Sequence, residues 1–216
     1  MSMTLVIGNK NYSSWSLRPW LFLKHHGIIF DEVKISLAQA DSKSRILGFS
    51  PSGKVPVLID GGLKVWDSLA IMEYLADRFP ETQAWPQEQA ERAFARSISA
   101  EMHAGFPALR AHCGMNCRRP PAAKKLPEEV RNDIERIGQI WQQCRKQYWD
   151  RGPWLFGQFT IADAMFAPMA LRFHLYQLDT NAEARGYVNA VLEHPALKEW
   201  VEAGMQELEV IPAYED

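Results

Sequence analysis

Three serine hydroxyls stand at the junction of two differently patterned segments near the start of the chain. Ser13, Ser14 and Ser16 lie between an apolar run (4–8) and an amphipathic segment (20–26). If a strand leads into a helix here, the hydroxyls meet the positive, N–H-rich end of the helix, which stabilises negative charge. A hydroxyl in this position can donate to a thiolate and lower the pKa of a thiol, or it can serve only as the helix N-cap. The residues themselves leave both roles open.

The thiol for such chemistry has to come from a bound molecule. The three cysteines of the chain are Cys113, Cys117 and Cys144, so none precedes position 113. They form no CxxC pair and show no Cys/His spacing of the kind that binds a metal. We therefore expect no redox role for the N-terminal region, no metal and no disulfide framework, in a reduced, cytoplasmic protein.

A second candidate anion site is the pair Asp67-Ser68. Trp66 ends an apolar run, and a helical pattern (68–79) starts at Ser68. Both Asp and Ser are good N-caps, so capping alone is one interpretation. In the other interpretation, the carboxylate of a small ligand docks at the Ser68 hydroxyl and the helix N-terminus, while Asp67 accepts a hydrogen bond from an ammonium group of the ligand. The α-amino acid end of a ligand would satisfy both groups.

Val55-Pro56 is the third candidate. Pro56 opens a predicted strand (55–60), where a proline cannot donate to the sheet. A cis bond would turn the chain and leave the N–H and C=O of Val55 facing outward, ready to pair with an extended peptide. A trans proline in an ordinary turn is the alternative.

The elements that must position these residues follow from hydrophobic patterning. Over the first 80 residues or so, the pattern reads βαβ, a short helix, then ββα. The strand–helix–strand start predicts a parallel crossover, and Asp60-Gly61-Gly62 predicts a hairpin. The predicted strands are 4–8, 28–36, 55–60 and 63–66, and the predicted helices are 14–26, 40–49 and 68–79.

The remainder of the chain shows only helical periodicity, after a polar, proline-flanked linker (80–91). The predicted helices are 94–113, 130–148, 160–176, 182–193 and 196–208. The fold class is therefore α/β plus all-α, with one domain at 1–82 and an all-helical domain at 88–216.

Composition excludes several classes of protein. The chain has 216 residues, of which 47% are apolar and 23% charged, as in ordinary soluble globular proteins. A net charge of −2 gives no basic field for nucleic acid. The N-terminus lacks the pattern of a signal peptide, and no run approaches the ~18 apolar residues of a membrane span.

Taken in order, these segments resemble the cytosolic glutathione S-transferase family, bacterial members included, over essentially the whole chain. GKVPVL (53–58) resembles the family's cis-proline segment, and WDSLAIMEYLADRF (66–79) resembles its acidic-Ser segment. SSWSLR (13–18) resembles SSCSWR of the zeta class, with Trp15 in place of the cysteine. FTIADAMFAP (159–168) resembles the N-terminal capping box of the helical domain.

The resemblance implies a thioredoxin-like N-terminal domain and glutathione as co-substrate. Ser14, or else Ser13, would bond the glutathione sulfur. The Val55 backbone would pair with the cysteinyl part, beside a cis Pro56. Asp67 and Ser68 would hold the γ-glutamyl end, and Lys54 or Lys43 would neutralise the glycyl carboxylate. The implied glutathione-binding residues are Ser13, Trp15, Lys43, Lys54, Val55, Pro56, Asp67 and Ser68.

The implied activity is a glutathione transferase acting on a small electrophile, as in detoxification, in a homodimer. A glutathione-dependent isomerase of the maleylacetoacetate type is the alternative within enzymes, although Trp15 in the cysteine position weighs against it. A non-catalytic binding module on the same fold is the alternative outside them.

The helical domain should supply the electrophile site. Along the predicted 94–113 helix, Ser99, His103, Phe106 and Arg110 would share one face, with Asn116 just beyond it. We expect His103, Phe106, Arg110 and Asn116 to bind an electrophile, preferably an anionic one. A solvated or dimer-contacting face is the alternative.

Overall fold

A computed structural model describes residues 2–215, which fall into two compact units. The N-terminal unit comprises the residues up to Thr82, together with Met115–Arg118 and the chain from Lys198 onward. The helical unit comprises Gln83–Gly114 and Arg119–Leu197. The break at Thr82 lies inside the linker expected from the sequence, whereas nothing in the sequence pattern indicated that the C-terminal segment belongs with the first unit.

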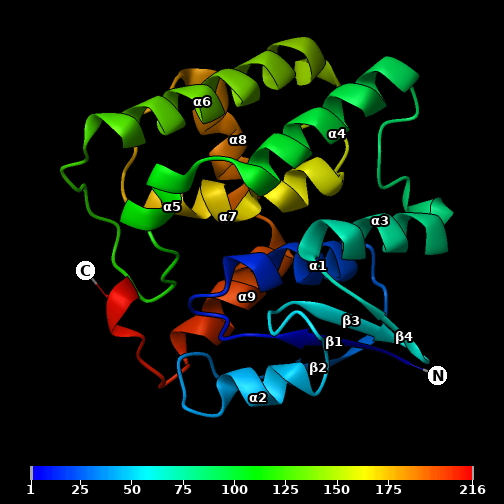
Figure 1. Cartoon of the computed structure of the whole chain (residues 1–216). Helices are drawn as coiled ribbons and strands as arrows, with labels where there is room; N and C mark the ends of the chain where they lie inside the picture. Colours follow the sequence, from blue (N-terminus) through cyan, green and yellow to red (C-terminus); the bar gives the residue numbers. More distant parts are fainter. Residues whose placement is uncertain (1, 216) are drawn as a thin grey trace. The chain divides into compact units, whose positions relative to one another are not determined.

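The N-terminal unit is built on a four-stranded mixed sheet in the order β2-β1-β3-β4. Strand β1 is parallel to β2 and antiparallel to β3, which pairs antiparallel with β4. Helices α1 and α3 cover one face of the sheet and α2 covers the other (Figure 1). The elements are β1 (Met3–Ile7), α1 (Ser14–His25), β2 (Phe30–Lys34), α2 (Ser42–Leu47), β3 (Val57–Asp60), β4 (Leu63–Val65), α3 (Ser68–Arg78) and the 3₁₀ turn Pro80–Thr82.

This order confirms the predicted βαβ, short helix, ββα arrangement. Val6 and Val57 are register partners in β1 and β3, and both are completely buried. They pack with Ile35 and Ile46 on the α2 face, because alternate residues of a strand point to opposite faces of the sheet. The second strand is shorter than the predicted 28–36, since Ile29 is 86% exposed and lies outside the sheet.

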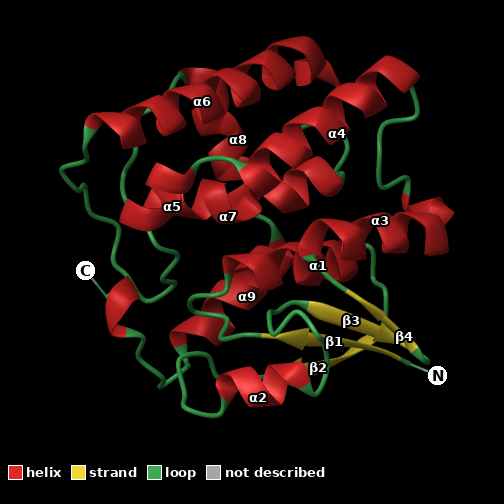
Figure 2. Ribbon diagram, viewed as in Figure 1, coloured by secondary structure: helices red, strands yellow, loops and turns green. Residues whose placement is uncertain are grey.

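The helical unit contains no strand of the sheet: β1 to β4 all belong to the N-terminal unit (Figure 2). Every residue from Ile161 to Phe173 in α7 is buried, as the apolar pattern predicted. The capping box at its start is present, with Thr160 and Asp163 bonded reciprocally. The helices of this unit are α4 (Gln89–Ala104), α5 (Pro107–His112), α6 (Glu128–Tyr148), α7 (Ile161–Leu175) and α8 (Ala182–Leu192), with a 3₁₀ turn at Trp149–Arg151. Helix α9 (Pro195–Met205) runs from this unit into the segment from Lys198 onward that belongs to the N-terminal unit, which also contains the 3₁₀ turn Pro212–Tyr214.

The prediction of one helix over 94–113 is wrong. The chain breaks after α4, where Phe106 adopts a left-handed conformation with φ of 62° and Pro107 starts α5. Proline has no N–H to continue the preceding helix and disfavours the helical conformation in the residue before it. A Cβ at Gly105 would lie 2.7 Å from the Glu101 carbonyl oxygen, so the break needs glycine there.

This break also removes the single face predicted for the electrophile residues. Ser99 and His103 lie on α4, whereas Phe106 is the N-cap of α5 and Arg110 lies within it. Cys113 is the C-cap residue of α5, at which this short helix ends.

Candidate functional site

The predicted serines lie at the start of α1. Ser13 is the N-cap residue and Ser14 is the first helical residue, and they are only 6% and 5% exposed. The Ser13 side chain does not cap the helix. Its hydroxyl donates to Ser16 Oγ at 2.8 Å, and Ser16 Oγ also accepts from the Gly8 N–H at 3.1 Å. The first turn of α1 contains no acidic residue, so no side chain of that turn neutralises the positive end of the helix.

Arg18 connects this helix end to the second one. Its side chain is completely buried, and its guanidinium carbon lies 4.2 Å from the centre of the Trp15 ring. Nη1 donates to Ser68 Oγ at 3.4 Å. Arg18 lies in the SSWSLR segment, but the residue pattern predicted no role for it. One feature of the sequence could have pointed to it: Arg18 lies one helical turn after Ser14, in an otherwise apolar stretch. Arginine is rarely fully buried, so an arginine in a buried helix is expected to have a specific partner.

Asp67 and Ser68 stand at the N-terminus of α3, as predicted. Asp67 is the N-cap, and its Oδ1 accepts from the Leu69 N–H at 3.0 Å. It is exposed, whereas Ser68 is fully buried against Arg18. The first turn of α3 also has no acidic residue. Two positive helix ends, those of α1 and α3, therefore lie in the same unit with a buried arginine between their serines.

The Val55-Pro56 peptide bond is cis, which confirms the prediction. Pro56 is buried and leads directly into β3, while Val55 is partly buried. Lys54, the residue before it, is exposed. Lys43 on α2 is exposed as well. All the predicted glutathione-binding residues belong to the N-terminal unit.

The predicted electrophile residues fall into different units. His103, Phe106 and Arg110 belong to the helical unit, and Asn116 belongs to the N-terminal unit. Arg110 donates to the carbonyls of Gly105 and Met102 and so braces the α4–α5 break, and burial lowers its pKa. Asn116 is 3% exposed, and its amide donates to the Tyr214 carbonyl at 3.0 Å and to the Glu215 carboxylate at 3.3 Å.

The cysteines do not provide a nucleophile. All three are buried and unpaired by disulfides. Burial raises the pKa of Cys113, and it raises the pKa of Cys117 and of Cys144 to about 12. Thiols of this kind stay protonated near neutral pH, so thiolate chemistry needs a sulfur from a bound molecule. Among residues 2–215, no three His, Cys, Asp or Glu side chains gather where they could hold a metal ion.

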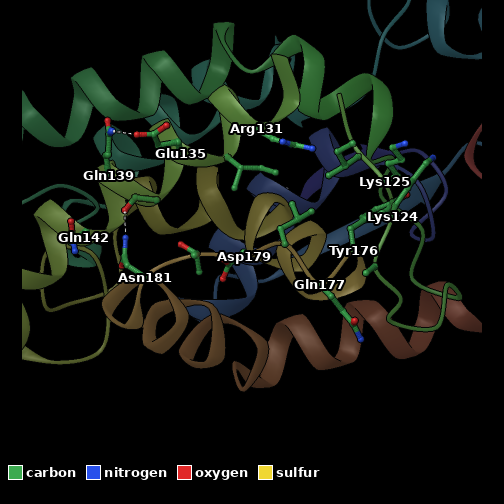
Figure 3. A pocket seen from close by; sticks show the side chains of 16 residues that line it. Lys124, Lys125, Arg131, Glu135, Gln139, Gln142, Tyr176, Gln177, Asp179 and Asn181 are labelled. Carbon is green, nitrogen blue, oxygen red and sulfur yellow. Dashed lines mark hydrogen bonds between the residues drawn. The ribbon is translucent and has the colours of Figure 1, made fainter. Parts of the chain in front are cut away.

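A cavity of about 730 Å³ lies elsewhere, in the helical unit. It is lined by α6 and by the segments 123–126 and 176–181. Lys124 and Lys125 stand toward one end and Gln142 and Asn181 toward the other, with Arg131 between them (Figure 3). None of the predicted site residues lines this cavity. No helix within the described residues has the length and apolar character needed to cross a membrane.

Comparisons with known proteins match both halves of the chain. Residues 12–78 match the family "Glutathione S-transferase, N-terminal domain", and residues 87–203 match "Glutathione S-transferase, C-terminal domain". Glutathione S-transferase T1 of Arabidopsis thaliana is 29% identical over 190 residues, covering 84% of this chain and 75% of the plant protein. A probable maleylacetoacetate isomerase of Caenorhabditis elegans is 32% identical over 96 residues, which is 44% of each chain.

A solved structure shows the shared fold over the full length. A glutathione transferase homolog from Burkholderia, crystallised with bound glutathione, superimposes with a TM-score of 0.73. The match covers 96% of this chain and 100% of that one, at 22% sequence identity. The four-stranded sheet with its three helices is thus a thioredoxin-like domain, followed in sequence by an all-helical domain.

Proposed function

The chain belongs to the glutathione S-transferase family, and from this premise we propose that it is a glutathione transferase with a serine as its sulfur ligand. Glutathione binds in the N-terminal unit, and its thiolate adds to a small electrophile. The protein supplies two effects: it lowers the pKa of the bound thiol, and it holds the two reactants together.

The observation that carries this proposal is the hydrogen bonding at the start of α1. Ser13 commits its hydroxyl proton to Ser16, whose oxygen is itself bonded to the Gly8 N–H. Donation from Ser13 to a sulfur would break this buried bond. Ser14 is the first residue of the helix and so lies nearer the N–H groups that stabilise negative charge, and we assign the role of sulfur ligand to it.

Other residues of the N-terminal unit would bind the glutathione peptide and add positive charge near its sulfur. The buried guanidinium of Arg18 lies one helical turn from Ser14, so its positive charge favours a thiolate there. Asp67 and Ser68 take the γ-glutamyl end, and the Val55 backbone pairs with the cysteinyl part. Lys54 or Lys43 faces the glycyl carboxylate. His103, Phe106, Arg110 and Asn116 stay a prediction for the electrophile site.

Two measurements test the proposal. The protein should be retained on immobilised glutathione and eluted by free glutathione. It should also accelerate the reaction of glutathione with an electrophile from a panel that begins with 1-chloro-2,4-dinitrobenzene. Retention without turnover across the panel would favour a non-catalytic glutathione-binding module, and no retention would refute the proposal.

The SSWSLR segment and the nematode relative together favour a second candidate, a glutathione-dependent isomerase. An isomerase adds the thiolate to a cis double bond, allows rotation and releases the thiolate again. Glutathione is then required but not consumed. Isomerisation of maleylacetone without loss of free thiol would establish this activity, and consumption of one thiol per product would establish transfer.

A further inference from the structure

We propose that the C-terminal segment Glu207–Glu215, here called the C-terminal latch, positions the loop that carries Ser13 and Ser14, with Glu207 as its main positioning residue. The inference rests on the proposed function for its chemical meaning, but its structural part can be tested separately. Latch and loop both belong to the N-terminal unit. The latch is the red end of the chain in Figure 1.

The loop between β1 and α1 makes its backbone hydrogen bonds at Lys10 and Asn11 with distant segments. The N–H groups of Lys10 and Asn11 donate to the two oxygens of the Glu207 carboxylate, at 2.9 and 3.1 Å. The Lys10 carbonyl accepts from Trp200 Nε1 at 2.8 Å. The Asn11 carbonyl accepts from the Cys117 N–H at 3.2 Å. The backbone hydrogen bonds of both residues are thus made with distant segments, and these partners cannot be predicted from the sequence of the loop.

Glu207 is suited to this task because it is only 8% exposed. Its carboxylate also accepts from Lys34 Nζ at 3.2 Å, so the charge is paired as well as hydrogen-bonded. Bonds to a buried, charged acceptor are stronger than neutral ones. Helix α9 also approaches the loop closely: a Cβ on Gly204 would lie 3.1 Å from the Asn11 nitrogen.

Tyr12 is the second attachment point, immediately before Ser13. Its ring stacks on Tyr214 with centres 5.7 Å apart, and its hydroxyl accepts from the Ile211 N–H at 3.2 Å. The same hydroxyl donates to the Glu215 carboxylate. Arg118 donates to Tyr12 and to the carbonyls of Glu207 and Glu209, and so ties the latch together.

Backbone hydrogen bonds connect the part of the loop that the latch holds to the two serines. The Asn9 carbonyl accepts from the N–H groups of Tyr12 and Ser13, at 3.2 and 2.8 Å, which closes the loop onto the helix start. A loop displaced at Lys10 and Asn11 therefore displaces Ser13 and Ser14 as well. A hydroxyl stabilises a thiolate only when it lies within hydrogen-bond reach, so small displacements are costly for catalysis.

The test uses Glu207→Gln, in which the amide oxygen can accept from only one of the two loop N–H groups in the present geometry. The matched control is Glu199→Gln on α9; the Glu199 side chain is 54% exposed, and its carboxylate pairs with Lys24. Amide hydrogen exchange of the full-length protein is measured first, without glutathione. Exchange at Lys10, Asn11, Ser13 and Ser14 should rise at least tenfold in Glu207→Gln and stay unchanged in the control.

The second readout is the pH profile of the glutathione reaction. In Glu207→Gln the apparent pKa of the bound thiol should rise by about one unit, so kcat/KM should fall about tenfold at neutral pH and recover at alkaline pH. The affinity for glutathione should change less than threefold. A merely structural role would lower Tm without moving the pH profile, and that result would overturn the positioning role.

Different results would refute the latch and the proposed function. Unchanged exchange at Ser13 and Ser14 in Glu207→Gln overturns the latch even if the protein is a transferase. A wild-type protein that does not bind glutathione overturns the proposed function, while the exchange data still decide whether the latch holds the loop. Gly204→Ala, which adds a methyl group against Asn11, provides an independent variant and should raise exchange at the same amides.

Discussion

Replacing Ser14 by alanine should raise the pKa of the bound glutathione thiol by about one to two units, whereas replacing Ser13 should change it by less than half a unit. The substitution removes one hydroxyl and leaves in place Asp67, Ser68 and Val55, the residues proposed to hold the glutathione peptide. Glutathione affinity should therefore change little, and the effect should be confined to the ionisation of the thiol and the steps that depend on it.

The magnitude follows from the burial and bonding of the two serines. A charge-assisted hydrogen bond contributes about 1.5–3 kcal/mol, and one pKa unit corresponds to about 1.4 kcal/mol. Ser14 is only 5% exposed, so water does not readily replace the lost donor. Ser13 instead donates to Ser16 at 2.8 Å, a neutral pair, so Ser13→Ala should lower the free energy of unfolding by about 1 kcal/mol.

The assay is a titration of the ultraviolet absorbance of the thiolate in the protein–glutathione complex, for wild type and both variants. A pH–rate profile with an accepted electrophile accompanies it. Turnover of Ser14→Ala at neutral pH should fall by about ten- to a hundredfold and approach wild type at alkaline pH. A larger shift in Ser13→Ala than in Ser14→Ala would reverse the assignment. No shift in either variant would mean that the serines only shape the helix start.

Three other predictions concern charge, acid stability and assembly. Arg18→Met should raise the bound thiol's pKa by about one unit in the same titration, because a buried positive charge one turn from Ser14 is lost; an unchanged value would confine Arg18 to packing. Burial lowers the pKa of His26 to about 4 from 6.5, so the unfolded chain binds the proton first. The free energy of unfolding should therefore decrease as pH falls from 6.5 through about 4, and denaturant titrations of His26→Gln should show a shallower decrease. We expect a homodimer, since Leu63 on edge strand β4 and Trp66 beyond it are 48% and 42% exposed; a monomer mass by light scattering at micromolar concentration would contradict this.

Local signals were sufficient for most of the fold. The cis bond at Val55-Pro56 and the capping box of Thr160 and Asp163 are where the sequence predicts them. The break between α4 and α5 was missed although Gly105 and Pro107 stand there, because the apolar spacing continues across it. Periodicity alone does not register a backbone that turns at one left-handed residue.

The candidate site shows the same division between local and distant information. The sequence by itself determined which residue types meet at the starts of α1 and α3, because strand-to-helix junctions and N-caps depend on neighbours a few positions away. It also determined that no cysteine precedes Cys113, so the thiol of the proposed reaction has to come from a bound molecule.

Only the tertiary structure decided how these groups are held. Arg18 reaches Ser68 across 50 positions of sequence, and Glu207 reaches Asn11 across 196. Such contacts exist only once the sheet has ordered its strands and the C-terminal segment has packed against the first unit. Side-chain hydrogen bonds between distant segments leave no periodic pattern in the sequence, and this is why Arg18 and Glu207 could be proposed for a role only from the folded chain.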